Sequence, residues 1–329
     1  MTNSVQDARD RFNRFYAEEQ ESFEKYLRTY RSNEKIRNKK YRGYNRGCLS
    51  SSWYRESLVD KSILVIGENR IGDEILTIGC LEELGSYCRH VVWRCDATLK
   101  QLFHRAFPGA DFVSANDPIP EVDGAIYSWE LIKHFRPALD KFHWTISGEF
   151  VPYLRTTLAR ETPAARYGTG SVPLVGLAWR SESVVKDKTC DLKSEPGWSI
   201  FFDELRDRVH FVSLQRGDSR DDRDFARSNY EVEIHQDQCI DRWNDLDDVA
   251  TQVAALDYIV SISTTVIHLA GALGVPGWVL LPHKSFAHWQ AGKHVSLWYP
   301  TVCPVRQENA GEWGNQLQRV ANELSTKIG

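Results

Sequence analysis

A repeated alternation of apolar strands and helices limits the fold of this chain more than any other feature. Short buried-strand runs recur and helical segments separate them; the strand runs lie at residues 62–67, 91–94, 174–179, 210–215, 258–262 and 278–281. This alternation is typical of parallel sheets whose crossover helices cover both faces. It predicts an α/β protein built from doubly wound sheets.

The alternation stops once, between residues 151 and 171, where Pro, Gly and Thr become frequent. Such a segment favours an interdomain hinge. We therefore expect four parts: a helical basic arm and linker (1–60), a first Rossmann-like domain (61–165), a second (166–308) and a terminal helix packing back on the domains (309–329). Further elements are expected as strands near Phe112, near Ile126 and at 231–234, and as helices at about 73–86, 200–206, 247–256, 265–273 and 313–327.

The net charge of the whole chain does not indicate a particular binding partner. The 329 residues carry 41 Lys and Arg against 45 Asp and Glu, a formal charge of -4, which argues against a nucleic-acid binder. Residues 31–46 are strongly basic, and Tyr30, Tyr41 and Tyr44 lie in or beside this run. This run favours a solvated helix face, with an anionic acceptor, RNA or peripheral contact with a membrane as alternatives.

The chain shows no membrane-spanning run of roughly 18 apolar residues, and its polar start has no secretory signal. We expect a soluble, cytoplasmic protein. The seven Cys residues are odd in number and never form CxxC, which indicates reduced thiols rather than a disulfide framework or a zinc site.

The first loop that suggests chemistry runs from Gly67 to Asp73, directly after a strand. Its glycines have the GxxxxG spacing of a phosphate-binding loop, but Asp73 stands where that loop requires lysine. No GxGxxG follows any predicted strand, so a dinucleotide site loses its main support. On spacing alone, a role as helix N-cap is favoured for Asp73 over a role as general base.

The second loop holds three hydroxyl side chains, Ser263, Thr264 and Thr265, between a strand and a helix. Hydroxyls and backbone N–H groups at a helix N-terminus form a site for a diphosphate. Thr264 is also a good N-cap, and His268, on an apolar helix, is more often a packed core residue than a ligand.

Asp245, Asp247 and Asp248 resemble the DxD motif that holds a divalent ion in some glycosyltransferases. They stand immediately before a helix, so N-capping explains them better. No His, Cys and carboxylate cluster with metal spacing and no GxSxG elbow is present elsewhere, so no metal is predicted.

Taken together, residues 61–329 resemble the metal-independent GT-B glycosyltransferases of the bacterial heptosyltransferase type. The closest likeness is to the glycosyltransferase-like domain found in tetratricopeptide-repeat proteins. The motifs that carry the resemblance are ENRIGDEI (68–75), PLVGLAWR (173–180), FVSLQRGD (211–218), AALDYIVSISTTVIHLAGALGVPGWVLLP (254–282) and LWYPTVCPVRQ (297–307).

The resemblance implies an acceptor domain first, a nucleotide-sugar domain second, and inversion at the anomeric carbon. Asp73 matches the family's Gly-Asp carboxylate and becomes the expected general base, with Glu68 as the alternative. The nucleoside-diphosphate sugar is a co-substrate, no cofactor is expected, and the acceptor is a hydroxyl of a glycan, a lipid-linked molecule or a protein. The expected donor-binding residues are Arg180, Lys188, Gln215, Ser263, Thr264, Thr265, His268, His283 and Lys284.

Two departures from the family pattern bear on the donor. Heptosyltransferases usually have Asp-Thr where this chain has Ser263 and Thr264. The loop after Trp179 also lacks the sequence pattern that is usual in the family. The sequence therefore does not name the sugar. Two alternative functions remain: an inactive nucleotide-sugar sensor or scaffold, and a sugar-nucleotide epimerase on the same framework.

Overall fold

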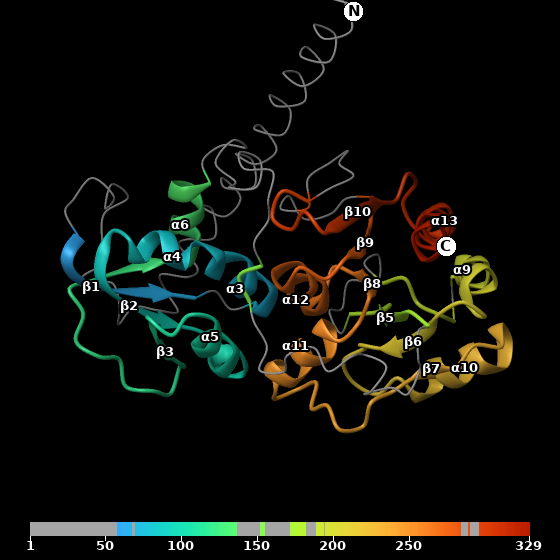
Figure 1. The fold of residues 1–329 in the computed structure, drawn as a ribbon, viewed down its shortest axis with the longest axis horizontal. Helices are drawn as coiled ribbons and strands as arrows, with labels where there is room; N and C mark the ends of the chain where they lie inside the picture. Colours follow the sequence, from blue (N-terminus) through green and yellow to red (C-terminus); the bar gives the residue numbers. More distant parts are fainter. Residues whose placement is uncertain are drawn as a thin grey trace, which may run out of the picture.

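The computed structural model describes residues 58–67, 70–136, 152–154, 172–181, 189–193, 195–283, 289 and 296–329. The predicted helical arm lies outside these residues. The described chain forms two parallel sheets, each with helices packed on it (Figure 1). This is the α/β architecture that the alternation predicts.

The first sheet has four parallel strands in the order β3-β2-β1-β4. Its elements are β1 (Leu58–Ile66), α3 (Ile71–Thr77), the 3-10 helix η2 (Ile78–Cys80), α4 (Leu81–Gly85), β2 (Cys88–Arg94), η3 (Ala97–Leu99), α5 (Lys100–Ala106), β3 (Asp111–Val113), β4 (Gly124–Tyr127) and α6 (Ser128–Phe135).

The second sheet has six parallel strands in the order β10-β9-β8-β5-β6-β7. Its elements are β5 (Leu174–Ala178), α9 (Gly197–Leu205), β6 (His210–Ser213), α10 (Arg220–Tyr230), β7 (Ile234–His235), α11 (Leu246–Ala254), β8 (Tyr258–Ile262), α12 (Thr265–Leu273), β9 (Gly277–Leu281), β10 (Val302–Arg306) and α13 (Gly314–Ile328).

Both faces of the second sheet are covered, which explains why its central strands are apolar without alternation. Along β5, Leu174 and Ala178 belong to one apolar cluster, whereas Val175 and Leu177 belong to another. The first of these clusters also contains residues of β1, α3 and α12. One core therefore continues from the first sheet to the second.

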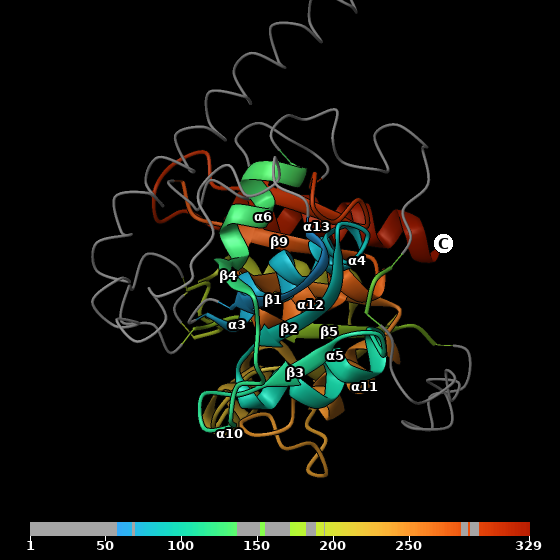
Figure 2. The ribbon, with the colours of Figure 1, turned by 90° about the vertical axis from the view of Figure 1, so that its left-hand side faces the viewer.

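Helices of the two halves pack directly on each other. The helix α3 lies against α12, and α5 lies against α11 (Figures 1 and 2). Across the second contact, the guanidinium of Arg105 forms a bidentate ion pair with Asp247, with Nη2 and Oδ2 2.6 Å apart. The α3–α12 contact matters most for function, because each of these helices follows the carboxyl end of a central strand.

Some elements differ from the sequence prediction. The strand expected at 231–234 is β7, only Ile234–His235, because Glu231 adopts a left-handed φ of 54° and ends α10. The helix expected at 73–86 is three consecutive short helices, and α6, α10 and β10 were not predicted. The described residues contain no helix long and apolar enough to cross a membrane, and the six cysteines within them are free thiols.

Candidate functional site

The order of the second sheet reverses at the boundary between β5 and β8. From β5 the chain winds outward through β6 and β7, and it then returns to place β8 on the other side of β5. In open parallel sheets, ligands bind outside the carboxyl ends of the strands at such a switch point. Five expected donor residues follow carboxyl ends at this edge: Arg180, Gln215, Ser263, Thr264 and His283.

The N-terminus of α12 is held without a side-chain cap. Thr264 is the N-cap residue, with extended φ and ψ of -125° and 174°, but its hydroxyl makes no capping bond. Its Oγ1 instead lies 3.1 Å from Oγ of Ser261. The backbone N–H groups in the first turn of a helix have no acceptor within the helix. Here the side chain of Thr264 does not accept a hydrogen bond from any of them. Thr265 is the first residue of α12 and, like Thr264, is partly exposed.

Ser263 is fixed by a tryptophan that follows it far along the chain. Its Oγ accepts a hydrogen bond of 2.7 Å from the indole Nε1 of Trp289, which is fully buried. The hydroxyl keeps its own proton to donate. Trp289 therefore orients the residue that stands where heptosyltransferases usually have aspartate.

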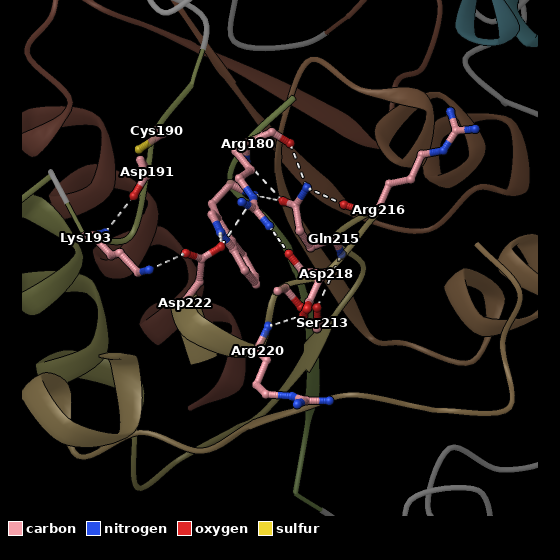
Figure 3. Close-up of polar contacts among 12 residues, drawn as sticks. Arg180, Cys190, Asp191, Lys193, Ser213, Gln215, Arg216, Asp218, Arg220 and Asp222 are labelled. Atoms are coloured by element: carbon pink, nitrogen blue, oxygen red, sulfur yellow. Dashed lines mark hydrogen bonds and ion pairs between the residues drawn. The ribbon is translucent and has the colours of Figure 1, made fainter. Parts of the chain in front are cut away.

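Both polar atoms of the Gln215 side-chain amide are hydrogen-bonded to neighbouring backbone groups. Its Oε1 accepts the N–H groups of Trp179 and Arg180 at 3.2 and 3.1 Å, and its Nε2 donates to the carbonyls of Arg180 and Arg216 at 3.0 and 3.1 Å (Figure 3). It is 2% exposed. The structure thus favours a role for Gln215 in shaping the turn after β5 over direct contact with a donor.

Asp222 of α10 anchors the side chain of Arg180. Its Oδ2 accepts the indole N–H of Trp179 at 3.1 Å and lies 3.3 Å from Nε of Arg180, while Oδ1 lies 3.4 Å from Nζ of Lys193 (Figure 3). Arg180 also donates from Nη2 to the carbonyl of Asp218. Asp222 is 4% exposed, so this buried carboxylate is balanced by two cations.

His268 lies one turn inside α12 and is 4% exposed. Its Nδ1 is 3.1 Å from the hydroxyl of Tyr299, and the rings of Tyr299 and Trp289 pack against it. Burial lowers its pKa from 6.5 to about 3. A neutral imidazole offers no positive charge to a phosphate, so the packing role is favoured over the donor contact.

His283 is exposed after β9, but both its backbone and its ring are held by Gln307. The N–H of His283 donates to Oε1 of Gln307 at 3.1 Å, and its Nδ1 lies 3.2 Å from the carbonyl of Gln307. Gln307 itself is 3% exposed. This pairing fixes the direction of the histidine ring at the sheet edge.

The loop after β1 is fastened to the end of β2. The N–H of Gly67 donates to the carbonyl of Arg94 at 2.8 Å, and a Cβ on Gly67 would lie 2.5 Å from that oxygen, so only glycine fits. Glu74, 4% exposed, accepts the N–H of Asp96 at 3.0 Å. These bonds set where α3 begins.

Asp73 is not the N-cap that its spacing favoured. The cap is Arg70, with extended φ and ψ of -118° and 121°, and Asp73 is the third residue of α3. A carboxylate in the first turn is stabilised by the positive end of the helix dipole. Asp73 follows Gly72, whose added Cβ would lie 2.8 Å from Cδ2 of His268. The turn bearing Asp73 and the first turns of α12 thus face the same domain contact.

The acidic run at residues 245–248 is engaged in structure. Oδ1 of Asp245 caps α11 by accepting the N–H groups of Asp247 and Asp248 at 3.0 Å each, which confirms the N-cap prediction. Asp247 binds Arg105. Within the described ranges, no group of three or more His, Cys, Asp or Glu side chains is arranged to hold a metal.

Three expected site residues, Glu68, Lys188 and Lys284, lie outside the described residues. Sequence reasoning also missed Asp222, Gln307 and Tyr299. Asp222 stands in the charged run RDDRD, which is typical of a solvated helix face, so nothing marked it. Gln307 carried a weak signal, because it is the last residue of the motif LWYPTVCPVRQ (297–307).

Several solved structures that superpose on this chain are glycosyltransferases. The glycosyl transferase family 9 protein from Veillonella parvula superposes with a TM-score of 0.57 at 14% identity, covering 83% of this chain and 98% of that one. The E. coli ADP-heptose LPS heptosyltransferase II gives 0.51 at 14% identity, covering 81% and 98%. The chain has the GT-B fold. At these identities the likeness concerns fold alone.

A further solved structure is the iron-containing dodecameric glycosyltransferase TibC from enterotoxigenic E. coli, with a TM-score of 0.53 at 13% identity, covering 83% of this chain and 77% of that one. Among curated proteins, FlbA of Caulobacter vibrioides is 30% identical over an alignment of 297 residues that covers 83% of this chain. The chain spans about half of FlbA, since the match covers 48% of it. No protein-family model matches the chain.

Proposed function

We propose that the chain is an inverting glycosyltransferase that moves a sugar from a nucleoside-diphosphate sugar to a hydroxyl acceptor. The observation that carries the proposal is the contact between α3 and α12, which brings the helix of Asp73 against the helix that begins at Thr265. The GT-B fold of the solved glycosyltransferases supports it.

The donor diphosphate binds at the N-terminus of α12. Its negative charge is favoured there by the helix dipole and by the amides of the first turn, with the hydroxyls of Ser263 and Thr264 beside them. Arg180, at the neighbouring strand end and held by Asp222, supplies a cation. These groups stabilise the charge that develops on the leaving diphosphate.

Asp73 acts as the general base on the opposite side of the reacting carbon. The acceptor oxygen forms a bond to C1 of the sugar while the bond from C1 to the diphosphate oxygen breaks, and its electron pair leaves with the diphosphate. The acceptor proton passes to the Asp73 carboxylate. A single displacement of this kind inverts the anomeric carbon, and NMR of the product tests that stereochemistry.

The reaction is proposed to need no divalent ion. The carboxylates that resemble a DxD motif are committed elsewhere, since Asp245 caps α11 and Asp247 pairs with Arg105. The helix N-terminus and Arg180 take the place of the ion. Accordingly, a chelator should leave the transfer rate unchanged.

The first experiment identifies the nucleotide. Melting temperatures are measured with ADP, GDP, UDP and their sugars, because a ligand at 100 times its Kd stabilises the folded state by roughly 2.7 kcal/mol. NMR of the responding nucleotide-sugar then follows its fate. Acceptor-dependent or slow water-dependent release of the diphosphate supports the transferase, whereas a new nucleotide-sugar or binding without turnover contradicts it.

Asp73→Asn tests the mechanism in single-turnover assays. Removing the base should lower the rate by about 10² to 10³, within the range that a general base contributes, while nucleotide affinity stays nearly unchanged. Asp60→Asn is the matched control, because Asp60 is an exposed carboxylate near the opposite end of β1. Full activity of Asp73→Asn would remove this residue from the mechanism.

A further inference from the structure

Two tyrosines, Tyr153 and Tyr299, lie at the contact between α3 and α12. Tyr153 lies in the short described segment that connects the two domains. Its backbone N–H and that of Leu154 donate to the carbonyl of Ala272 in α12, at 3.1 Å each. Its hydroxyl donates to the carbonyl of Ile75 in α3 at 2.8 Å. Tyr153 is therefore hydrogen-bonded to α12 through its backbone and to α3 through its side chain.

Tyr299 holds the imidazole of His268 in place. It is fully buried, and its hydroxyl lies 3.1 Å from Nδ1 of His268. It packs so closely on α12 that a Cβ on Gly271 would lie 2.2 Å from its ring. The ring has no room to move aside, so it keeps the imidazole in its contact with Gly72 of α3.

The proton of the Tyr153 hydroxyl lies on its bond to α3. The carbonyl of Ile75 can only accept a hydrogen bond, so Tyr153 must donate to it. Desolvation raises the pKa of the Tyr153 phenol well above its usual value, so this proton is retained at neutral pH.

The groups that these two tyrosines hold lie beside the two halves of the proposed site. His268 is three residues into α12 from Thr265, and Ile75 is two residues beyond Asp73 in α3. Tyr153, Tyr299 and His268 are named the relay: Tyr153 binds α3 and α12 directly, and Tyr299 holds the imidazole that contacts Gly72 of α3. A shift of the α12 tip is therefore passed to α3 through packed side chains rather than through solvent.

We propose that Tyr153 and Tyr299 are positioning residues that couple the nucleotide-binding tip of α12 to the placement of Asp73. The inference rests on the proposed function for its effect on catalysis. The coupling itself needs only that a nucleoside diphosphate binds at α12. Without either hydroxyl the two helices keep their folds but lose their fixed register, and a displacement of about 1 Å at a reacting group lowers the rate by about 10².

The test compares Tyr153→Phe and Tyr299→Phe with the matched control Tyr230→Phe. Tyr230 also donates to a backbone carbonyl, that of Leu192 at 2.9 Å, but both groups belong to the second domain. The probe is whichever of ADP, GDP and UDP raises the melting temperature most. Hydrogen exchange of residues 71–77 is measured with and without it, together with its affinity.

In the wild type and in Tyr230→Phe, the nucleotide should slow exchange in α3. In both relay variants this protection should vanish while affinity changes less than threefold, and kcat should fall 10- to 100-fold with KM for the donor nearly constant. Since Tyr153 is only partly buried, Tyr153→Phe keeps the test decisive where Tyr299→Phe does not fold.

Failure of the inference and failure of the proposed function give different results. If the wild type transfers sugar but the relay variants match Tyr230→Phe in exchange and kcat, the inference is overturned and the function stands. If the wild type transfers nothing yet nucleotide protects α3 through Tyr153 and Tyr299, the coupling stands and the function fails. Absence of any nucleotide effect on α3 in the wild type overturns the coupling.

Discussion

Replacing Gly72 with alanine should drive α3 and α12 apart. The new Cβ would lie 2.8 Å from Cδ2 and 3.2 Å from Nε2 of His268, where ordinary contacts are 3.4–4 Å. The imidazole cannot swing away easily, because Tyr299 holds Nδ1 and the ring of Trp289 lies over it with centroids 5.1 Å apart. Relief therefore requires α3 to move.

The size of the effect follows from that overlap. Restoring contact distance takes a shift of about 0.5–1 Å, and overpacking of this kind costs about 1–3 kcal/mol. Gly72 is helical and has no positive φ, so alanine fits its backbone conformation. Because alanine loses less conformational entropy on folding than glycine, this change alone stabilises the helix by roughly 0.5–1 kcal/mol. The net loss of stability is thus at most about 2.5 kcal/mol, whereas a 1 Å displacement of Asp73 lowers the rate by about 10².

The assay measures single-turnover transfer and urea unfolding side by side. Gly85→Ala is the matched control, because Gly85 is likewise a helical glycine of the first domain and an added Cβ there meets nothing within 4 Å. That variant should be slightly stabilised and fully active. If Gly72→Ala behaves like Gly85→Ala in both measurements, the contact with His268 does not position the base.

Two further predictions concern the domain contact. Arg105→Met leaves the buried carboxylate of Asp247 without its bidentate partner, so urea unfolding at pH 7 should show that the free energy of unfolding falls by about 1.5–3 kcal/mol. The control Arg89→Met breaks an exposed ion pair and should lower it by under 1 kcal/mol. Equal losses in the two variants would contradict the account. Because burial lowers the pKa of His268 from 6.5 to about 3, the unfolded chain binds more protons between these values. The stability from the neutral ring is fully present above pH 6.5 and is lost as pH falls toward 3, so between pH 7 and pH 5 the wild type should lose about 2 kcal/mol more than His268→Gln. Parallel acid curves for the two proteins would refute the burial argument.

The sequence predicts the strands of this fold well where they are buried on both faces. β5, β8 and β9 were found because central parallel strands are short apolar runs. The Asp245 cap was found because capping is decided by a few neighbouring residues. In each case the information is local.

Other elements depend on contacts that no local pattern shows. The helix α10, RDDRDFARSNY, has almost no apolar stripe, and it is fixed by Asp222 reaching Trp179 and Arg180. The start of α3 was misjudged because Arg70, a poor capping residue, begins it. The roles of Gln215 and His268 likewise depend on partners brought together by the fold.

The most direct test of the account is a crystal structure of this chain with the nucleoside diphosphate that stabilises it most. The account predicts diphosphate oxygens within hydrogen-bond distance of the backbone N–H groups of Thr265 and Val266, with the Asp73 carboxylate facing the same space. A nucleotide bound on the first domain, or at an edge of the second sheet away from α12, would contradict it.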